Sequence, residues 1–404
     1  MTTDSTTLGS TVSASQTRVS GDTTPEFVLL AGMTAVLLVL GLVMTFSASF
    51  VQSAAETGNP FRIFLRQLLW CAVGLGPMVA AALIDHRHWR RVAMPLLVAS
   101  LVATALVAVP GVGSEVNGAR RWFDLGPVSF QPTELLKLSL PLGLAHVVAS
   151  RWQQIRGGDL KALLLPATPV IALVGALVMA EPDLETAALL GVIGGVVLFV
   201  GGLPVRIMVG GGGVLGVLGA AAIATTEFRR ARFAAWLDPT SYADTFGYQT
   251  MQGLIALGSG GWNGAGLGQG RGKWLYIPNA HTDFIFAIIG EELGLIGALV
   301  VLGLFAALAV AGTRTARNAP DAFGRLLAAA ITCWLLLQAG INIGSVVGLL
   351  PVTGVTLPLV SFGGSSLVFT MLGLGVLMSI ARAGRAPTEH HPRSSGPKGG
   401  SAPA

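Results

Sequence analysis

The segment His281-Thr282-Asp283 combines an imidazole, a hydroxyl and a carboxyl group immediately before a long apolar run that begins at Phe284. A carboxylate at such a boundary between water and lipid is placed to act as a general base or to bind a metal. An Asp directly before a helix is also a frequent N-cap, which accepts hydrogen bonds from backbone N–H groups. These residues by themselves leave the catalytic and the structural role open.

Two further pairs of charged residues fall within apolar runs, where charges are costly. Glu134 and Lys137 are three positions apart, so on a helix they share a face. They would form either a helix-stabilising ion pair or the polar wall of a cavity in which Lys137 meets an anionic ligand. Glu291 and Glu292 lie about two helical turns beyond Asp283 and must point into the protein or into a cavity.

Two arginines and two carboxylates mark the ends of other apolar runs. Arg120 and Arg121 are adjacent, and guanidinium groups suit phosphate oxygens, although contact with lipid headgroups would also explain them. In Glu181-Pro182-Asp183 the proline ends a helix and places two carboxylates at its end. These carboxylates would belong either to a surface turn or to a polar lining.

Membrane-spanning elements have to position these side chains. Of the 404 residues 52% are hydrophobic and 11% are charged, whereas about 25% are charged in an average soluble domain. The mean hydropathy of +0.70 is that of a chain largely embedded in lipid, which excludes a disordered protein, a coiled coil and a nucleic-acid-binding domain. A span needs about 20 apolar residues. We therefore predict an all-α polytopic membrane protein with about ten transmembrane helices, at 27–48, 64–84, 92–109, 132–149, 163–180, 186–203, 207–225, 284–311, 326–350 and 367–381.

The distribution of basic residues predicts the orientation. With the N-terminus inside, 15 of the 25 Lys and Arg residues fall in the inner segments, while the short outer loops hold Arg62, Arg66, Arg120 and Arg121. Cytoplasmic segments carry the excess of Lys and Arg, so both termini are predicted to be cytoplasmic. The polar segments 1–26 and 382–404 are predicted to be disordered cytoplasmic tails around a transmembrane domain at 27–381.

One long outer loop, residues 226–283, is predicted to have its own structure, because structureless connections of this length are uncommon. It contains Arg232 and a segment, Thr245–Gly260, that predicts a short amphipathic helix with Gln249 and Gln252 on one face. The alternating glycines from 264 to 272, followed by Lys273, do not have the spacing of a phosphate-binding loop. We interpret this run as a flexible or tightly turning segment.

The last outer loop, residues 350–366, has two prolines, three glycines and several hydroxyls, among them Ser365 and Ser366. This composition predicts a re-entrant or broken segment, which is tolerated only where it is buried in protein or lines a wet cavity. Gln338 and Asn342 give the preceding span a polar face and are expected to form interhelical hydrogen bonds. Most of the unusual polar residues therefore lie on the extracytoplasmic side.

Taken together and in order, these segments resemble the SEDS family of cell-wall proteins (the FtsW, RodA and SpoVE type), over about residues 27–381. Pro278-Asn-Ala-His281 is more similar to the cell-division branch than to the elongation branch. The chain departs from the usual family pattern at Glu185, Thr133 and Phe362, where Gly, Ser and Tyr are usual. The matching stretches are Ser47-Ala-Ser49, Asn117-Gly-Ala-Arg-Arg-Trp122, Gln131-Pro-Thr-Glu134 with Lys137, Glu181-Pro-Asp183, Gly247-Tyr-Gln249 with Gln252, His281-Thr-Asp-Phe-Ile-Phe286, Gly290-Glu-Glu-Leu-Gly294, Asn342-Ile-Gly344 and Ser361-Phe-Gly-Gly-Ser-Ser366.

The resemblance implies a peptidoglycan glycosyltransferase that polymerises lipid II at the outer face of the cytoplasmic membrane, with Asp283 as the catalytic base. The acceptor would be the GlcNAc hydroxyl of lipid II, and the donor would be the polyprenyl-linked glycan. A divalent cation, Mg or Mn, is compatible with the family but is not indicated by the residues. The predicted substrate-binding residues are Arg120, Arg121, Glu134, Lys137, Arg232, Gln249, Gln252, Lys273, His281, Thr282, Asn342, Ser365 and Ser366.

The same residues leave other functions open. A transporter that flips lipid II, an elongation-type polymerase and a non-catalytic scaffold of the division machinery would all use this surface. The family implies a class B penicillin-binding protein as transpeptidase partner, together with division-machinery proteins, and a position at the division septum. No nucleic-acid partner is expected.

Overall fold

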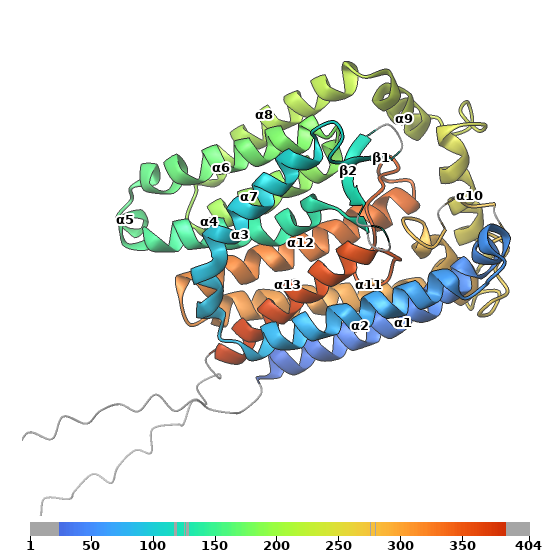
Figure 1. Ribbon diagram of the computed structural model, residues 1–404, viewed down its shortest axis with the longest axis horizontal. Coiled ribbons are helices and arrows are strands. Elements are labelled where there is room, and N and C mark those ends of the chain that lie inside the picture. The colour runs from blue at the N-terminus through green and yellow to red at the C-terminus, as the bar shows by residue number, and fades with distance from the viewer. Residues whose placement is uncertain are drawn as a thin grey trace, which may run out of the picture.

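The structure is a computed structural model that describes residues 24–116, 119–124, 126, 129–274, 276–278 and 280–384. The described part of the chain contains ten helices of 17 residues or more, and each coincides with one of the ten predicted spans. They run back and forth between the two ends of the bundle (Figure 1). The predicted all-α polytopic fold is therefore confirmed. These helices are α1 (Pro25–Thr57), α2 (Arg62–Leu83), α3 (His86–Val107), α4 (Pro132–Ser150), α6 (Leu160–Ala180), α7 (Leu184–Val200), α8 (Val205–Ala224), α11 (Ile285–Asn318), α12 (Ala322–Val346) and α13 (Gly364–Ala383).

Eight of the ten helices are long and apolar enough to cross a membrane. The other two are α7, which is apolar but has only 17 residues, and α4, which contains Glu134 and Lys137. Most residues of α4 are buried among the other helices, which shelter its charges from lipid. The protein is thus a multi-pass membrane protein.

Several helices extend beyond the apolar runs that predicted them. Helix α1 continues to Thr57 instead of ending at 48, and α11 continues to Asn318 instead of 311. Hydropathy marks the part of a helix that lies in lipid, while polar residues continue the helix into water. Of the predicted tails, the structure describes residues 24–26 and 382–384; residues 25–26 and 382–383 are helical, and the other tail residues lie outside the described residues.

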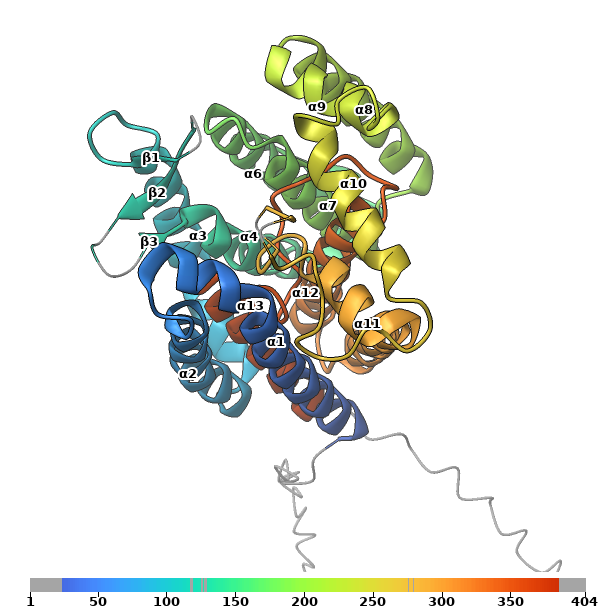
Figure 2. The same ribbon diagram turned by 90° about the vertical axis from the view of Figure 1, so that its right-hand side faces the viewer.

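The core lies where α4, α12 and α13 pack together. Helix α13 packs along α2, α4 along α3, and α12 along α11, whereas α8 lies at the periphery and has no buried residue. Figure 2 views this arrangement from the end that carries the long loops. Trp334 of α12 is fully buried at the centre. The most buried helices are therefore those that carry polar side chains inward.

We call the end of the bundle shown in Figure 2 the loop end. It holds two short helices, α9 (Glu227–Leu237) and α10 (Phe246–Ser259), and these confirm that the loop 226–283 is structured. Helix α10 also confirms the helix predicted at 245–260. A three-stranded antiparallel sheet of β1 (Ser114–Val116), β2 (Ala119–Asp124) and β3 (Ser129–Phe130) was not predicted. The remaining short helix, α5 (Trp152–Arg156), lies at the opposite end.

Between α12 and α13, residues 347–363 form the irregular buried segment that proline and glycine predicted. The Val360 side chain is fully buried, and Gln67 Nε2 donates to the Ser361 carbonyl at 3.1 Å. Gly41 of α1 allows this segment to approach, because a Cβ there would lie 2.5 Å from the Leu359 carbonyl oxygen. Polar side chains and close packing thus satisfy backbone that lipid would not tolerate.

Helix α11 is interrupted at Gly294, whose φ of 69° and ψ of −168° are not helical. The carbonyls of Glu291 and Glu292 accept instead from Ala265 N at 2.9 Å and Gly266 N at 3.0 Å. The span predicted at 284–311 is therefore present, but its helix is broken at Gly294.

The amides on the far side of the break are satisfied in the same way. Leu295 N donates to the Gly261 carbonyl at 2.9 Å, and Ile296 N donates to the Trp262 carbonyl at 3.2 Å. We call residues 260–273 the glycine loop. It is built into the break in α11.

We predict that Gly294→Ala strongly destabilises the protein. A Cβ at position 294 would lie 2.3 Å from Gly264 N, and the backbone conformation is one that costs a non-glycine residue on the order of 1–3 kcal/mol before any clash. The check is thermal unfolding of detergent-purified protein. The matched control is Gly303→Ala in the same helix, which meets no atom within 4 Å and should melt at or slightly above the wild-type temperature. Equal melting temperatures for the two variants would contradict the break.

Candidate active site

Asp283 lies at the loop end, two residues before α11 begins, and its side chain is only 9% exposed. Thr282 Oγ1 donates to its Oδ1 at 3.0 Å. Burial raises the pKa of Asp283 to about 6, although the Thr282 hydroxyl and the positive charge of Arg232 oppose the shift. A carboxylate with a pKa near neutrality is suited to accept a proton in catalysis.

Asp283 does not cap α11. The N-cap residue is Phe284, and no side chain accepts a hydrogen bond at this helix start. The N-cap interpretation of Asp283 is therefore wrong, because the backbone turns into the helix one residue later than the cap geometry requires. The carboxylate is left for other partners.

The backbone around Asp283 is fastened from two sides. Asn342 Nδ2 donates to the Asp283 carbonyl and to the Val355 carbonyl, both at 2.8 Å. Phe362 N donates to the His281 carbonyl at 2.9 Å, and the two rings lie 5.4 Å apart between centroids. Asn342 is predicted to bond to another helix, but both of its acceptors lie outside the helices, so the prediction of an interhelical hydrogen bond is wrong for this residue. Helix α12 and the irregular segment 347–363 thus hold Asp283 in place.

The His281 side chain is buried, and its Nδ1 has no hydrogen-bond partner among the described residues. Burial lowers the pKa of His281, although the charge of Glu56 opposes the shift. The imidazole is therefore neutral at pH 7.

Arg232 of α9 is the cation whose field reaches Asp283. Its Nη1 lies 3.1 Å from Glu185 Oε1, and its guanidinium carbon lies 5.9 Å from the Phe228 ring centroid. Glu185 is the residue that stands where the family usually has Gly. Glu185 therefore pairs with Arg232 within the site, and the sequence could not show this contact.

The two predicted phosphate-binding arginines of β2 pair with carboxylates in this structure. Arg120 Nη2 lies 3.2 Å from Glu115 Oε2. Arg121 Nη1 lies 3.5 Å from Asp183 Oδ2, and its other nitrogens donate to the carbonyls of Glu181 and Pro182. Arg121 therefore ties the β-sheet to the turn between α6 and α7.

Glu181 and Asp183 are both buried, so the interpretation as an exposed surface turn is wrong. Asp183 caps α7 by accepting from Thr186 N at 3.1 Å. Both carboxyl oxygens of Glu181 are without a partner among the described residues. Burial raises the pKa of Glu181 to about 8, Asp183 adds to the shift, and Arg121 opposes it. Glu181 is therefore mostly protonated at pH 7.

The predicted Glu134–Lys137 ion pair is present and buried, at 2.8 Å from Lys137 Nζ to Glu134 Oε1. Lys137 Nζ also donates to Gln338 Oε1 at 3.3 Å. Gln338 in turn donates to the Thr356 carbonyl at 3.0 Å, so it links α4 to the irregular segment through α12. Lys137 is engaged with protein atoms here.

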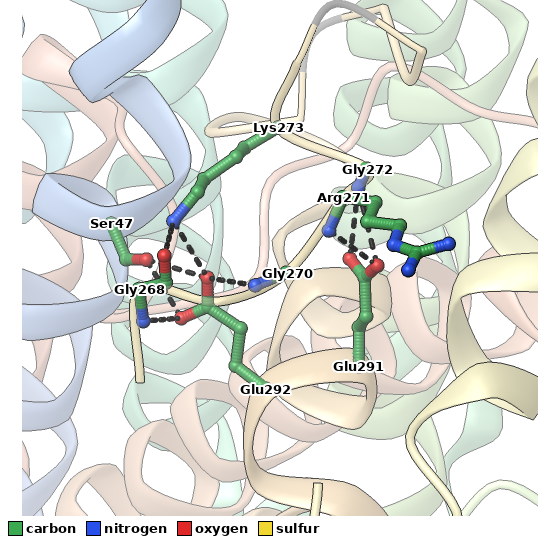
Figure 3. A network of polar contacts seen from close by, with 8 residues as sticks. All are labelled: Ser47, Gly268, Gly270, Arg271, Gly272, Lys273, Glu291 and Glu292. Carbon is green, nitrogen blue, oxygen red and sulfur yellow. Dashed lines mark hydrogen bonds and ion pairs between the residues drawn. The ribbon is translucent and has the colours of Figure 1, made fainter. Parts of the chain in front are cut away.

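The remaining predicted residues lie on the same end of the bundle but do not form one cluster. Gln249 Nε2 donates to the Pro278 carbonyl at 3.0 Å, and Gln252 is half-buried on the same helix, α10. Ser366 Oγ lies 3.3 Å from Thr356 Oγ1, while Ser365 Oγ is buried without a partner among the described residues. Lys273 is buried against Glu292, with 3.3 Å between Nζ and Oε1 (Figure 3). The structure thus joins His281, Thr282, Asn342 and Arg232 to Asp283, and it places the other candidates in separate pairs.

The fold and sequence were compared with known proteins. A family model described as a cell cycle protein, FtsW/RodA/SpoVE, matches residues 28–386. The chain belongs to the FtsW/RodA/SpoVE family. It is 42% identical over 357 residues to a probable peptidoglycan glycosyltransferase FtsW of Mycobacterium tuberculosis, covering 88% of this chain and 68% of the relative. It is 36% identical over 365 residues to stage V sporulation protein E of Bacillus subtilis, covering 90% and 98%.

Two solved structures show the same fold as this FtsW/RodA/SpoVE-family chain. One is a chain of a peptidoglycan synthase complex that coordinates polymerization and crosslinking, with a TM-score of 0.72, 33% identity and coverage of 87% of this chain and 96% of that one. The other is the rod shape determining protein RodA of Thermus thermophilus, with a TM-score of 0.65, 30% identity and coverage of 89% and 97%. The resemblance stated from the motifs is confirmed.

The described residues of this protein provide few ligands for a metal ion. The described residues contain no group of three or more His, Cys, Asp or Glu side chains that could hold an ion. Mg²⁺ is usually held by one or two carboxylates together with substrate phosphates. Asp283 is the carboxylate here that fits this mode, so a divalent cation stays a prediction tied to a bound pyrophosphate.

We predict that Asp283→Asn raises thermal stability at neutral and alkaline pH. The folded-state pKa of about 6 lies above the ordinary 3.8, so the stability supplied by the protonated carboxyl is lost as pH rises from about 4 to about 6. Above pH 7 the ionised carboxylate therefore costs on the order of 3 kcal/mol, which the amide avoids. Thermal unfolding at pH 8 and pH 4 measures the difference. It should be large at pH 8 and shrink towards pH 4, and a lower melting temperature for the variant at pH 8 would contradict a raised pKa.

Proposed function

We propose that this protein is a peptidoglycan glycosyltransferase that polymerises lipid II into glycan strands during septal cell-wall synthesis. The observation that carries the proposal is the buried Asp283 carboxylate, held by Thr282 and Asn342 at the loop end of the bundle. Relatives 36–42% identical over most of the chain are named probable peptidoglycan glycosyltransferase FtsW, which supports this reaction.

Asp283 would act as the base on the acceptor. Its carboxylate removes the proton from the GlcNAc hydroxyl of the incoming lipid II as the oxygen attacks the anomeric carbon of the donor glycan. The bond to polyprenyl pyrophosphate breaks, and this leaving group departs as a stable anion, so no strong general acid is required. A single displacement of this kind inverts the anomeric centre, by analogy with inverting glycosidases.

Arg232 is the cation best placed to meet the pyrophosphate. Its side chain is 25% exposed, and its charge already acts on Asp283. All five candidate cations are paired with carboxylates, but Arg120 and Arg121 are also partly exposed, whereas Lys137 and Lys273 are buried. If a Mg or Mn ion takes part, Asp283 would hold it together with the substrate phosphates, and the ion would supply further positive charge to the leaving group.

The proposal places the loop end at the outer face of the cytoplasmic membrane, with both termini in the cytoplasm. The excess of basic residues in the segments at the opposite end supports this orientation. A solved chain of the same fold belongs to a peptidoglycan synthase complex that coordinates polymerization and crosslinking. This supports a class B penicillin-binding protein as partner. A position at the division septum, among division-machinery proteins, goes with the similarity to FtsW.

The break in α11 at Gly294 favours a second candidate function, the transport of lipid II across the membrane. Transporters often bind substrate at discontinuous helices within the membrane. Here, however, the break is filled by the glycine loop, and the base lies near the boundary rather than at mid-membrane. The shared fold with the rod shape determining protein RodA keeps an elongation-type polymerase as an alternative.

We predict that Asp283→Asn lowers lipid II polymerisation by about 10²–10⁴-fold, because general-base catalysis contributes a factor of this size. The assay measures glycan polymer formed by purified protein in detergent, with and without the penicillin-binding partner. The matched control is Asp244→Asn, an exposed carboxylate in the same loop, which should retain wild-type activity.

Three results would contradict the polymerase proposal. Polymerisation by Asp283→Asn at the wild-type rate would remove Asp283 as the base. If wild type and control form no polymer, but lipid II crosses the bilayer of reconstituted vesicles, the protein is a transporter. If they do neither and Asp283→Ala cells still divide, the scaffold function is supported.

A further inference from the structure

Two buried carboxylates of α11 are surrounded by backbone amides of the glycine loop (Figure 3). Glu292 is fully buried and uses both oxygens, accepting from Gly268 N at 3.0 Å and from Gly270 N at 3.3 Å. Ser47 Oγ of α1 lies 2.7 Å from each Glu292 oxygen, and Lys273 Nζ lies 3.3 Å from Oε1. Glu292 therefore joins α1, α11 and the glycine loop.

Glu291 binds the next amides along the same loop. Its Oε1 accepts from Arg271 N at 2.7 Å, and Gly272 N lies 3.0 Å from Oε2. Within the described residues no cation lies within 4 Å of this carboxylate. Backbone dipoles rather than a side-chain charge thus compensate its burial.

The alternating glycines are required by this arrangement. A Cβ at Gly270 would lie 2.9 Å from Glu291 Oε2, and a Cβ at Gly272 would lie 3.0 Å from the same atom. Gly268 has a φ of 76°, a conformation that side chains disfavour. The pattern that resembles a phosphate-binding loop is an anion-binding loop whose anions are the protein's own carboxylates.

The glycine loop leads directly to the catalytic segment. Nine residues lie between Lys273 and Asp283, and both ends of this stretch are attached to the first turns of α11. Within it, Ile277 N donates to the Gly272 carbonyl at 3.1 Å. A displacement of the glycine loop would therefore change the path of the chain that ends at Asp283.

We infer that Glu291 and Glu292 are positioning residues for the reaction at Asp283, and that Lys273 belongs to their network and does not contact the substrate. This inference rests on the proposed polymerase function. Lys273 is 8% exposed, and its ammonium group donates to two protein acceptors, the Gly268 carbonyl and Glu292 Oε1. The two glutamates fix the glycine loop against α11 and thereby hold the segment 274–282.

The geometry predicts which of the two neutral variants, Glu292→Gln or Glu291→Gln, has the larger effect on polymerisation. In Glu292→Gln, one oxygen becomes an NH₂ group that faces amide, hydroxyl or ammonium donors, and Lys273 loses its counter-charge. In Glu291→Gln, the retained Oε1 can still accept from both Arg271 N and Gly272 N. We expect kcat for lipid II polymerisation to fall on the order of 10- to 100-fold for Glu292→Gln, and less for Glu291→Gln, with KM unchanged in both.

Lys273→Met separates positioning from substrate contact. Removing one member of a buried ion pair leaves an unpaired charge, so Lys273→Met should lower kcat without raising KM. The double variant Lys273→Met/Glu292→Gln removes both charges, and its loss should be smaller than the product of the two single losses. Glu227→Gln, an exposed carboxylate of α9, is the matched control and should behave as wild type.

Hydrogen exchange tests the network without any activity. In Glu292→Gln the amides of Gly268 to Gly272 should exchange faster than in wild type, while helices distant from the loop stay unchanged. If the wild-type protein forms no polymer, the proposed polymerase function is wrong. The exchange result still tests whether Glu292 orders the glycine loop. A raised KM with unchanged kcat in Lys273→Met, or wild-type kcat and exchange in Glu292→Gln, would overturn the inference.

Discussion

The break in α11 at Gly294 determines how the loop end is built. Two carbonyls and two N–H groups leave the helical pattern there, and each unsatisfied group inside a membrane costs several kcal/mol. Residues 261–266 provide all four partners, so the glycine loop cannot move away without exposing them. The loop 226–283 therefore supplies hydrogen-bond partners to a membrane-spanning helix. This explains how Asp283, which follows a long loop, can be held in a fixed position.

The buried charges of this protein fall into two groups. Glu134 is paired with Lys137, Glu292 is paired with Lys273 and loop amides, and Glu291 binds amides alone. Among the described residues Asp283 has neither a cation within ion-pair distance nor several amide donors, and burial accordingly raises its pKa to about 6. A group that is inadequately compensated in this way is destabilising for the fold. With its raised pKa, Asp283 also takes up a proton more readily than an ordinary aspartate, which is what a general base must do.

The sequence predicted those features of the fold that depend on the lipid environment or on neighbouring residues. Lipid requires about 20 apolar residues per span, so all ten helices could be located, and proline with glycine marked the irregular segment before α13. The break at Gly294 could not be predicted, because glycine is common in transmembrane helices and one glycine alone indicates no break. The glycine run predicts only a flexible or tightly turning segment, because the carboxylates that order it lie about 20 positions further along the chain. Long-range pairing of this kind leaves no local signal.

In the candidate site, too, long-range pairing could not be predicted from the sequence, and Arg232 shows this most clearly. Charge and position identified Arg232 and Asp283 from the sequence, but the field that acts on Asp283 depends on what else binds Arg232. Glu185, an unusual residue for the family, lies 3.1 Å from this guanidinium and offsets part of its charge. A glycine at 185 would leave the full positive charge near Asp283, which would favour the ionised carboxylate and weaken it as a base. The departure from the family pattern therefore acts in the direction of a more basic Asp283, while it also gives Arg232 a carboxylate that an incoming pyrophosphate has to replace.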